Sequence, residues 1–461
     1  MFPLVYQARA GYIWPWSAPI LFCMKTLAGF LLLPLVFFLL WGFAKRSHWT
    51  FAKRRLYAVA LGLVLLGISG ALGLRAARNV QEPPQWDFGS MRLYAEVAAN
   101  GLNFYEPESY RIVTQGRRVP QDLREEVVEV GFQYPPFTML LFRPWASLAP
   151  RTGIVLWYAL HLAALLADIF LLWQLFTRKE GWLGLGLAGA LLLLLFGSYS
   201  TVGFAQTLYL LLFFWLMAWR SWGHWPSGVW LALAVIVKPI GTALFVPALL
   251  YRQGRVLLAG AATLIIASIA TLAAFGKDTF SSYFTSGVAR RIPLTLFAEA
   301  ENQSLLAVLM RWQTGAEISK PLTPENIFVA VAVALAAVTC WVIVRLGAQR
   351  WELASALVII LALMIYPGSL TSYSVLLAPV ILLLWSKREE LGAKLSIAFA
   401  LAGIYPVLGL NYGRFSTWAY VGLWVCVVAA ANRLVAVQKR QIQPAHNSLA
   451  GKVETQEVAC S

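Results

Sequence analysis

The sequence predicts an all-α polytopic membrane protein, and three observations support this fold class. Of the 461 residues, 59% are hydrophobic and only 13% are charged, whereas soluble domains carry about 25% charged residues. The mean hydropathy is +0.67. Apolar stretches long enough to cross a hydrocarbon core of about 30 Å recur along the chain. A cytosolic enzyme and a disordered chain are therefore both excluded.

Membrane spans are predicted wherever an apolar stretch approaches the length that a bilayer requires. The eleven candidates are 27–43, 57–74, 151–176, 182–198, 204–219, 256–275, 325–346, 352–366, 370–385, 395–410 and 416–433. A further apolar run, 227–251, is interrupted at Lys238-Pro239. Because proline breaks a helix, this run predicts two half-length helices, which brings the bundle to about 11–13 transmembrane helices.

Basic residues predict the orientation, because cytoplasmic loops are enriched in Lys and Arg. All basic clusters fall on the cytoplasmic side only if run 227–251 enters and returns on the same side as a hairpin. The residues that fix this orientation are Lys45, Arg46, Lys53, Arg54, Arg55, Arg178, Lys179, Arg252, Arg255, Arg345, Arg350, Lys387, Arg388, Arg433, Lys439 and Arg440. The net charge of +16 has the same origin, so we expect no nucleic-acid partner.

Two long outer-face loops, 75–150 and 276–324, follow from this orientation. Both exceed ordinary helix connections and are expected to carry function. In the first, apolar residues at helical spacing from Phe88 to Ala98 predict a short amphipathic helix that stops at Gly101. We divide the chain into an N-terminal segment with an extra transmembrane helix (1–56), a membrane domain (57–433) and a disordered cytoplasmic tail (434–461).

Asp87 is the candidate catalytic residue of the first outer loop. A carboxylate at the membrane surface is able to accept a proton from a sugar hydroxyl as a general base. The alternative is a structural role, because Asp is a favoured N-cap and a helix is predicted from Phe88. The sequence leaves both roles open.

Lys238 lies inside the apolar hairpin, where an unpaired charge costs a few kcal/mol. Its natural partner is an anion such as a lipid phosphate. The alternative is that its ammonium group reaches a membrane interface along its apolar stem.

The second outer loop holds a polar cluster of Glu299, Glu301, Asn302 and Gln303 that is suited to sugar hydroxyls; a solvated loop is the alternative. Arg290-Arg291 in the same loop are candidates for a phosphate, although a basic pair near lipid headgroups explains them equally. His161 and Asp168 share one helix face, as a proton relay or, more simply, as interhelical hydrogen-bonding groups. Gln206 is most simply a polar packing residue.

Metal sites and nucleotide sites have no sequence support. The four cysteines show no metal-ligand spacing, and glycine-rich phosphate loops are absent. We expect no cofactor and no tightly held metal, with a loosely bound divalent cation at Asp87 as an open alternative.

Five motifs in order resemble a known family. They are Asp87-Phe88 with Tyr94 and Gly101-x-Asn103-x-Tyr105; Tyr134-Pro135-Pro136-Phe137; Gly203 with Gln206; Lys238-Pro239; and Asn302-Gln303-Ser304-Leu305. Together they resemble the GT-C superfamily of integral-membrane glycosyltransferases, and most closely glycosyltransferase family 87, the polyprenyl-phosphate-mannose-dependent alpha-1,2-mannosyltransferase-like group.

The resemblance implies a GT-C-like bundle and a multi-pass protein of the cell membrane, in bacteria the inner membrane with the active site on the periplasmic face. It implies a polyprenyl-phosphate-linked sugar donor, a glycan or lipid-linked acceptor, and Asp87 as the base of an inverting transfer. Lys238, with Arg290 or Arg291, would stabilise the leaving phosphate, and the other expected substrate-binding residues are Tyr134, Gln206, Glu301, Asn302 and Gln303. Mannose is the expected sugar, but the segment Tyr366–Ser374 departs from the family pattern and leaves sugar and acceptor open.

Two other classes of protein compete with an enzyme. A secondary transporter or lipid-linked-sugar flippase would fit the broken hairpin, yet such proteins usually show paired discontinuous helices, and the sequence indicates a single break. A non-catalytic accessory protein that only binds lipid-linked glycans is the third possibility.

Overall fold

The computed structural model describes residues 50–81, 85–116, 131–285, 302–313, 324–387, 417 and 420–436, and the all-α polytopic fold is confirmed within them. Five helices there are long and apolar enough to cross a membrane, and five shorter apolar helices accompany them. The predicted total of 11–13 spans stays a prediction, because candidates 27–43 and 395–410 lie outside the described residues, as does most of the tail.

The first half of the described chain contains the predicted span 57–74, the first outer loop and the three predicted spans after it. Its elements are α3 (Phe51–Gln81), η2 (Gln85–Gly89), α4 (Ser90–Ala99), α5 (Pro107–Thr114), η4 (Pro136–Thr138), α7 (Met139–Phe142), η5 (Arg143–Ser147), α8 (Pro150–Leu172), η6 (Trp173–Thr177), η7 (Arg178–Glu180), α9 (Gly181–Leu194), α10 (Phe196–Phe204) and α11 (Leu208–Arg220).

The second half contains the broken run and the remaining spans. Its elements are α12 (Trp225–Val237), η8 (Pro239–Leu244), α13 (Phe245–Leu250), α14 (Gly254–Thr285), α17 (Leu305–Gln313), α18 (Pro324–Leu346), η9 (Ala348–Arg350), α19 (Trp351–Ile365), η10 (Thr371–Leu377) and α20 (Ala378–Ser386), and an apolar helix follows over Tyr420–Ala436.

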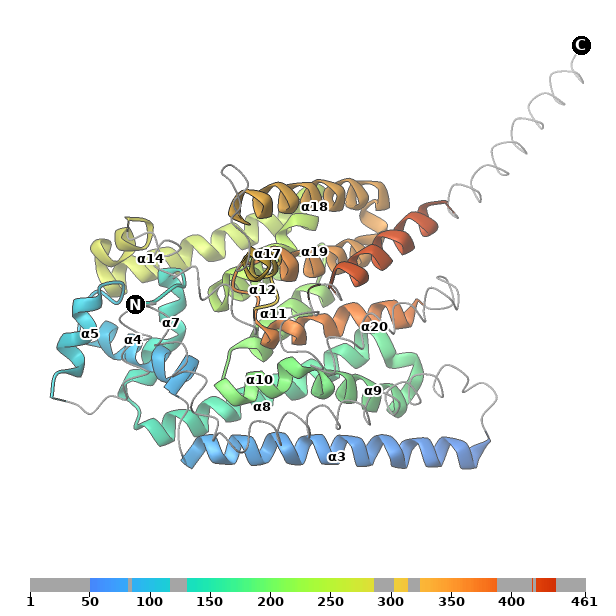
Figure 1. Ribbon diagram of the computed structural model, residues 1–461, viewed down its shortest axis with the longest axis horizontal. Helices are drawn as coiled ribbons and strands as arrows, with labels where there is room; N and C mark the ends of the chain where they lie inside the picture. Colours follow the sequence, from blue (N-terminus) through green and yellow to red (C-terminus); the bar gives the residue numbers. More distant parts are fainter. Residues whose placement is uncertain are drawn as a thin grey trace, which may run out of the picture.

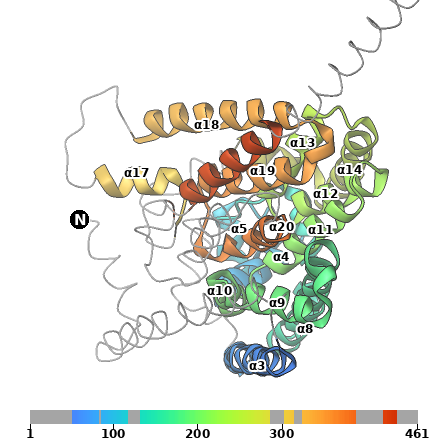
Figure 2. The same ribbon diagram turned by 90° about the vertical axis from the view of Figure 1, so that its right-hand side faces the viewer.

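The helices form a bundle with the outer-loop elements at one end. In Figure 1, α4, α5 and α7 gather at the left, next to the end of α3 that leads into them. Figures 1 and 2 both place α3 on the outside of the bundle, where it packs against α9. Its side chains are mostly exposed, as a lipid-facing helix requires, whereas α19 is largely buried at the centre.

The predicted helical hairpin at Lys238-Pro239 is present. Helix α12 ends at Val237, and Lys238 adopts an extended conformation with φ −153° and ψ 140°. The chain then returns through η8 and α13, so that Val256 at the start of α14 lies against Gly228 at the start of α12. The run therefore enters and leaves at the same end of the bundle, as the charge pattern predicted.

A second helix break, at Leu195, was not predicted from the sequence. Leu195 between α9 and α10 has φ −57° and ψ 128°, and no proline marks it. The break fits a tertiary contact: the Gly197 N–H donates to Ser374 Oγ of η10 at 2.9 Å. A Cβ atom at position 197 would lie 2.7 Å from the Val375 nitrogen, so only glycine permits this approach.

The end of α3 is fixed beside α10 by polar contacts. Arg75 Nη1 donates to Tyr199 Oη at 2.9 Å, and Asn79 Nδ2 donates to the Gly203 carbonyl at 3.0 Å. These contacts hold the C-terminal end of α3 against the C-terminal end of α10. The element that comes next after α3 is η2, which contains Asp87, and Gln206 follows α10. The same contacts therefore bring the Asp87 motif close to the motif of Gly203 and Gln206.

Candidate active site

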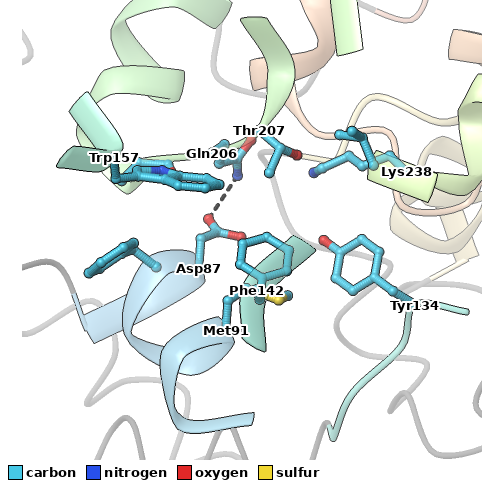
Figure 3. A pocket seen from close by; sticks show the side chains of 11 residues that line it. Asp87, Met91, Tyr134, Phe142, Trp157, Gln206, Thr207 and Lys238 are labelled. Atoms are coloured by element: carbon cyan, nitrogen blue, oxygen red, sulfur yellow. Dashed lines mark hydrogen bonds between the residues drawn. The ribbon is translucent and has the colours of Figure 1, made fainter. Parts of the chain in front are cut away.

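The ends of several helices meet around one narrow cavity. It lies where η2 and α4 face the start of α8, the link from α10 to α11, and the C-terminal end of α12 (Figure 3). The lining residues are Asp87, Phe88, Met91, Tyr134, Phe142, Trp157, Ala205, Gln206, Thr207, Val237 and Lys238. Four of the predicted site residues (Asp87, Tyr134, Gln206 and Lys238) are thus brought together from positions up to 151 residues apart in the sequence.

Asp87 does not act as a helix N-cap. The N-cap of α4 is Gly89, and no side chain caps the helix. The Asp87 carboxylate instead accepts a hydrogen bond from Gln206 Nε2 at 2.9 Å (Figure 3). Asp87 also has a φ of +31°, which costs a non-glycine residue of order 1–3 kcal/mol and is typical of functional sites. The N-cap alternative for Asp87 is therefore wrong, and its carboxylate faces the cavity.

The surroundings of Asp87 favour a proton-accepting carboxylate. Partial burial raises the pKa of the Asp87 carboxyl above its ordinary value, while the positive charge of Lys238 and the hydrogen bond from Gln206 act in the opposite direction. A raised pKa brings a carboxylate closer to the basicity that a general base needs at neutral pH.

Lys238 is the cation of the cavity. Its side chain is 4% exposed, and its Nζ donates to Tyr373 Oη at 3.1 Å. The same Nζ lies 4.6 Å from the Tyr373 ring centroid and 5.9 Å from that of Tyr134, both within cation–π range. In the described ranges it forms no ion pair with a carboxylate. The ammonium group of Lys238 is therefore buried against Tyr373 rather than exposed, and its charge remains available to an anion.

Tyr134 covers the cavity from the first outer loop (Figure 3). Tyr105 Oη donates to its carbonyl at 2.7 Å, and this bond ties the Tyr134 segment to the Gly101–Tyr105 motif. Burial raises the pKa of the Tyr134 phenol, so the hydroxyl stays protonated and available as a hydrogen-bond donor.

Gln206 is fixed by a left-handed turn. Ala205 at the end of α10 has φ +53°, its carbonyl accepts a bond from Trp157 Nε1 at 2.7 Å, and the Gln206 N–H donates to the Thr201 carbonyl at 2.9 Å. The turn places the Gln206 amide against Asp87. Gln206 thus holds the Asp87 carboxylate. The sequence had suggested a role in packing alone.

Asn302 and Gln303 are buried, at 1% exposure each, but neither lines the cavity. Asn302 Nδ2 donates to the Pro367 carbonyl at 2.6 Å, and the Gln303 N–H donates to the Ser369 carbonyl at 2.6 Å. The segment therefore pairs with the loop that precedes η10. In this structure the segment holds that loop in place, and its predicted contact with a substrate stays a prediction.

Tyr373 is the site residue that sequence reasoning missed. It lies at the start of η10, and its ring is 5.8 Å from that of Tyr366. Asn302 is thus linked to Lys238 only indirectly. It contacts the segment Tyr366–Ser369, the Tyr366 ring packs near that of Tyr373, and Tyr373 contacts Lys238. The only sequence signal was that Tyr366–Ser374 departs from the family pattern.

Other predicted residues fall elsewhere. Glu301, Arg290 and Arg291 lie outside the described residues. His161 is buried on α8, and its Nδ1 contacts the Trp157 carbonyl of the same helix at 2.9 Å. Asp168 is fully buried, and neither of its carboxyl oxygens has a hydrogen-bond partner among the described residues. Asp168 therefore does not form the expected interhelical hydrogen bond among the described residues.

The cavity is closed in this structure. Its volume of about 10 Å³ corresponds to room for about one water molecule. Within the described ranges no three His, Cys, Asp or Glu side chains lie together as metal ligands do. A substrate would need the aromatic side chains around Asp87 to move, and most of these side chains belong to the first outer loop.

Comparison with known proteins identifies the family. Two proteins of Mycobacterium tuberculosis, from strains CDC 1551 and H37Rv, are each named alpha-(1->3)-arabinofuranosyltransferase and are 28% identical to this chain over 174 residues. The matched region covers 35% of this chain and only 40% of each relative. No solved structure gives a significant match. The sequence model of glycosyltransferase family 87 matches residues 132–367, just over half of the chain, and the chain therefore belongs to glycosyltransferase family 87.

Proposed function

We propose that this chain is a membrane glycosyltransferase that moves a sugar from a polyprenyl-phosphate-linked donor to a glycan or lipid acceptor at the outer face of the bacterial inner membrane. One observation carries the proposal: a carboxylate, Asp87, and a cation, Lys238, line the same narrow cavity. Family membership supports the reaction class.

The two residues have complementary tasks. Asp87 accepts the proton of the acceptor hydroxyl as the hydroxyl oxygen attacks the anomeric carbon of the donor sugar. The bond from that carbon to the phosphate oxygen breaks, and its electron pair leaves with the polyprenyl phosphate. Lys238 stabilises the growing phosphate charge, with the Tyr134 hydroxyl as a further donor.

The stereochemistry follows from the single carboxylate. Direct displacement with one base forms no covalent sugar–enzyme intermediate, so the anomeric configuration inverts. Among the described residues that line the cavity, Asp87 is the only carboxylate, whereas retaining glycosidases place a second carboxyl group about 5 Å away as nucleophile.

The donor sugar has two candidates. The motifs of the chain resemble a mannose-transferring group, whereas the printed name of the two mycobacterial relatives specifies arabinofuranose. Both are therefore tested. Purified protein in lipid vesicles is supplied with radiolabelled polyprenyl-phosphate-mannose, polyprenyl-phosphate-arabinofuranose or GDP-mannose, together with a panel of glycan acceptors.

We expect label to move to an acceptor from one lipid-linked donor and not from GDP-mannose. Transfer from GDP-mannose alone would contradict the proposed donor class, whereas transfer from the arabinofuranosyl lipid alone would correct the expected sugar.

A lipid-linked-sugar flippase is the second candidate. One observation favours it: two discontinuous helices, broken at Leu195 and at Lys238, both lead into the cavity wall, and transporter sites are often built this way. Movement of labelled donor across the vesicle membrane without transfer to any acceptor would support this candidate over the enzyme.

A further inference from the structure

A second hollow lies beside the cavity, on the first outer loop. One wall is the face of α4 that carries Arg92, Glu96, Ala99 and Asn100, and the other wall is segment 146–149 after η5. We name this hollow the α4 groove. Its volume is about 380 Å³, which is within the range of about 300–1,000 Å³ that is typical of ligand sites.

The polar groups of the α4 groove are fixed in place. Arg92, Glu96 and Asn100 follow at intervals of four and share one helix face. Arg92 Nη2 pairs with Glu96 Oε1 at 3.0 Å and donates to the Leu148 carbonyl at 3.0 Å. Asn100 Nδ2 donates to the Glu96 carbonyl at 2.8 Å. The groove therefore presents donors and acceptors that are already ordered before a ligand arrives.

The charge balance of the α4 groove favours a neutral ligand. The positive charge of Arg92 is compensated by Glu96, and both side chains are less than 20% exposed. A phosphate would meet a carboxylate here, whereas a sugar uses both groups, because its hydroxyls donate to carboxylate oxygens and accept from guanidinium N–H groups. The chemistry therefore fits a polyhydroxylated, uncharged chain.

The α4 groove lies next to the cavity that holds Asp87. Phe88 and Met91 line the cavity from the same stretch of chain that presents Arg92 to the groove. On the opposite wall, Phe142 lines the cavity and segment 146–149 lines the groove. Phe88 and Leu148 both lie against Gly153, at the junction. Helix α4 has 10 residues and so extends about 15 Å away from the reacting carboxylate.

We propose that the α4 groove binds the acceptor glycan and directs its terminal hydroxyl to Asp87. This inference rests on the proposed function and adds a subsite to it. The sugar units that do not react would occupy the groove, and their binding energy would orient the reacting hydroxyl. Donor lipid and acceptor glycan then approach the carboxylate from different directions, the donor from Lys238 and the acceptor from α4.

The test compares acceptors of different length. Octyl glycosides that carry one or three mannose residues, and the same pair with arabinofuranose, are used with wild type, Ala99→Trp and Ser147→Trp. Both positions are exposed in the α4 groove, so the added indole fills the groove without entering the core. Ile112→Trp on α5 is the matched control, because Ile112 is 53% exposed and outside the groove.

In the wild type and the control we expect KM for the three-unit acceptor to be about tenfold below that for the one-unit acceptor, which is the effect of about 1.4 kcal/mol of added binding. In both groove variants this ratio falls towards one, while KM for the donor lipid is unchanged. An unchanged ratio in both variants would overturn the proposal.

A second measurement does not depend on turnover. Saturation-transfer NMR of the three-unit glycosides with Asp87→Asn protein should detect binding, and Ala99→Trp added to that protein should remove it. Binding that persists in the double variant would contradict the α4 groove. Wild type that binds the glycoside through the groove but transfers no sugar from any donor would instead contradict the proposed function.

Discussion

Asp87 combines a left-handed backbone, partial burial and a single side-chain partner, Gln206. The first two features oppose folding, because strain and desolvation both raise the free energy of the folded state, and the hydrogen bond from Gln206 offsets only part of the desolvation. Residues of this kind persist where function requires them. The strained backbone and the buried carboxylate of Asp87 therefore favour a role in chemistry over a role in stability.

Asp87→Asn is expected to keep or raise thermal stability at pH 7. The pKa of Asp87 is raised in the folded state, so the folded chain holds this proton more tightly than the unfolded chain does. The ionised carboxylate therefore costs stability as the pH rises from the unfolded pKa through the folded one. Thermal unfolding of both proteins in lipid at pH 5 and pH 7 checks the sign. A Tm that is lower in the variant at pH 7 would assign Asp87 a structural role.

Lys238→Met is expected to shift the pH dependence of transfer. Ionised Asp87 is the active base, so kcat/KM rises with pH through the pKa of Asp87 in the free enzyme. The charge of Lys238 lowers that pKa, and its removal moves the rising limb to higher pH and lowers the plateau about 10²-fold. Lys387→Met is the control, because Lys387 pairs with Glu352 on α19 at 3.2 Å. If the rising part of the pH profile of kcat/KM lies at the same pH in Lys238→Met as in the wild type, Lys238 does not act on Asp87.

At the scale of elements, the two helix breaks differ in how far the sequence predicts them. Pro239 removes a backbone donor from its own helix, and this effect needs no partner. The break at Leu195 is accompanied by the approach of Gly197 to η10, a contact between segments about 177 residues apart. Gln206 and Tyr373 were underestimated for the same reason: their roles depend on neighbours that single-sequence patterns do not reveal.

Gly241→Ala tests the hairpin at Lys238. A Cβ atom there would lie 2.5–2.6 Å from the Ala234 carbonyl group and the Val235 nitrogen, and overpacking of this kind costs about 1–3 kcal/mol. We expect a lower Tm and weaker donor use, because Lys238 would be displaced. Gly62→Ala on α3 is the matched control: nothing lies within 4 Å of that site, and alanine favours a helix by up to about 1 kcal/mol. Equal Tm values for the two variants would contradict the tight return of the chain.

For the molecule as a whole, charge and hydropathy predicted more of the helix arrangement than local sequence patterns did. The basic clusters were consistent with one another only if run 227–251 returned to its starting side, and the structure contains that hairpin. In the predicted orientation, the exit of α3, the entry of α8 and the entry of α11 lie at the outer face. These are the ends that meet at the cavity, so a site on one side of the membrane follows from the global pattern.

Topology is testable by cysteine labelling. In a background without the four native cysteines, His224→Cys between α11 and α12 and Arg255→Cys at the start of α14 should react with a membrane-impermeant maleimide from the same side. Ala99→Cys on α4 should react from the opposite side. Both flanking positions are exposed. Labelling of positions 224 and 255 from opposite sides would mean that run 227–251 crosses the bilayer once.

We propose above that Asp87 is the base of a sugar transfer from a lipid-linked donor. The most direct measurement is transfer of radiolabelled sugar from the polyprenyl-phosphate donor to a glycan acceptor by wild type and by Asp87→Asn, both in lipid and both shown to bind the donor. We expect that Asp87→Asn binds the donor as the wild type does but transfers sugar at least about 10²-fold more slowly, the typical contribution of a general base. Transfer at the wild-type rate in Asp87→Asn would contradict it.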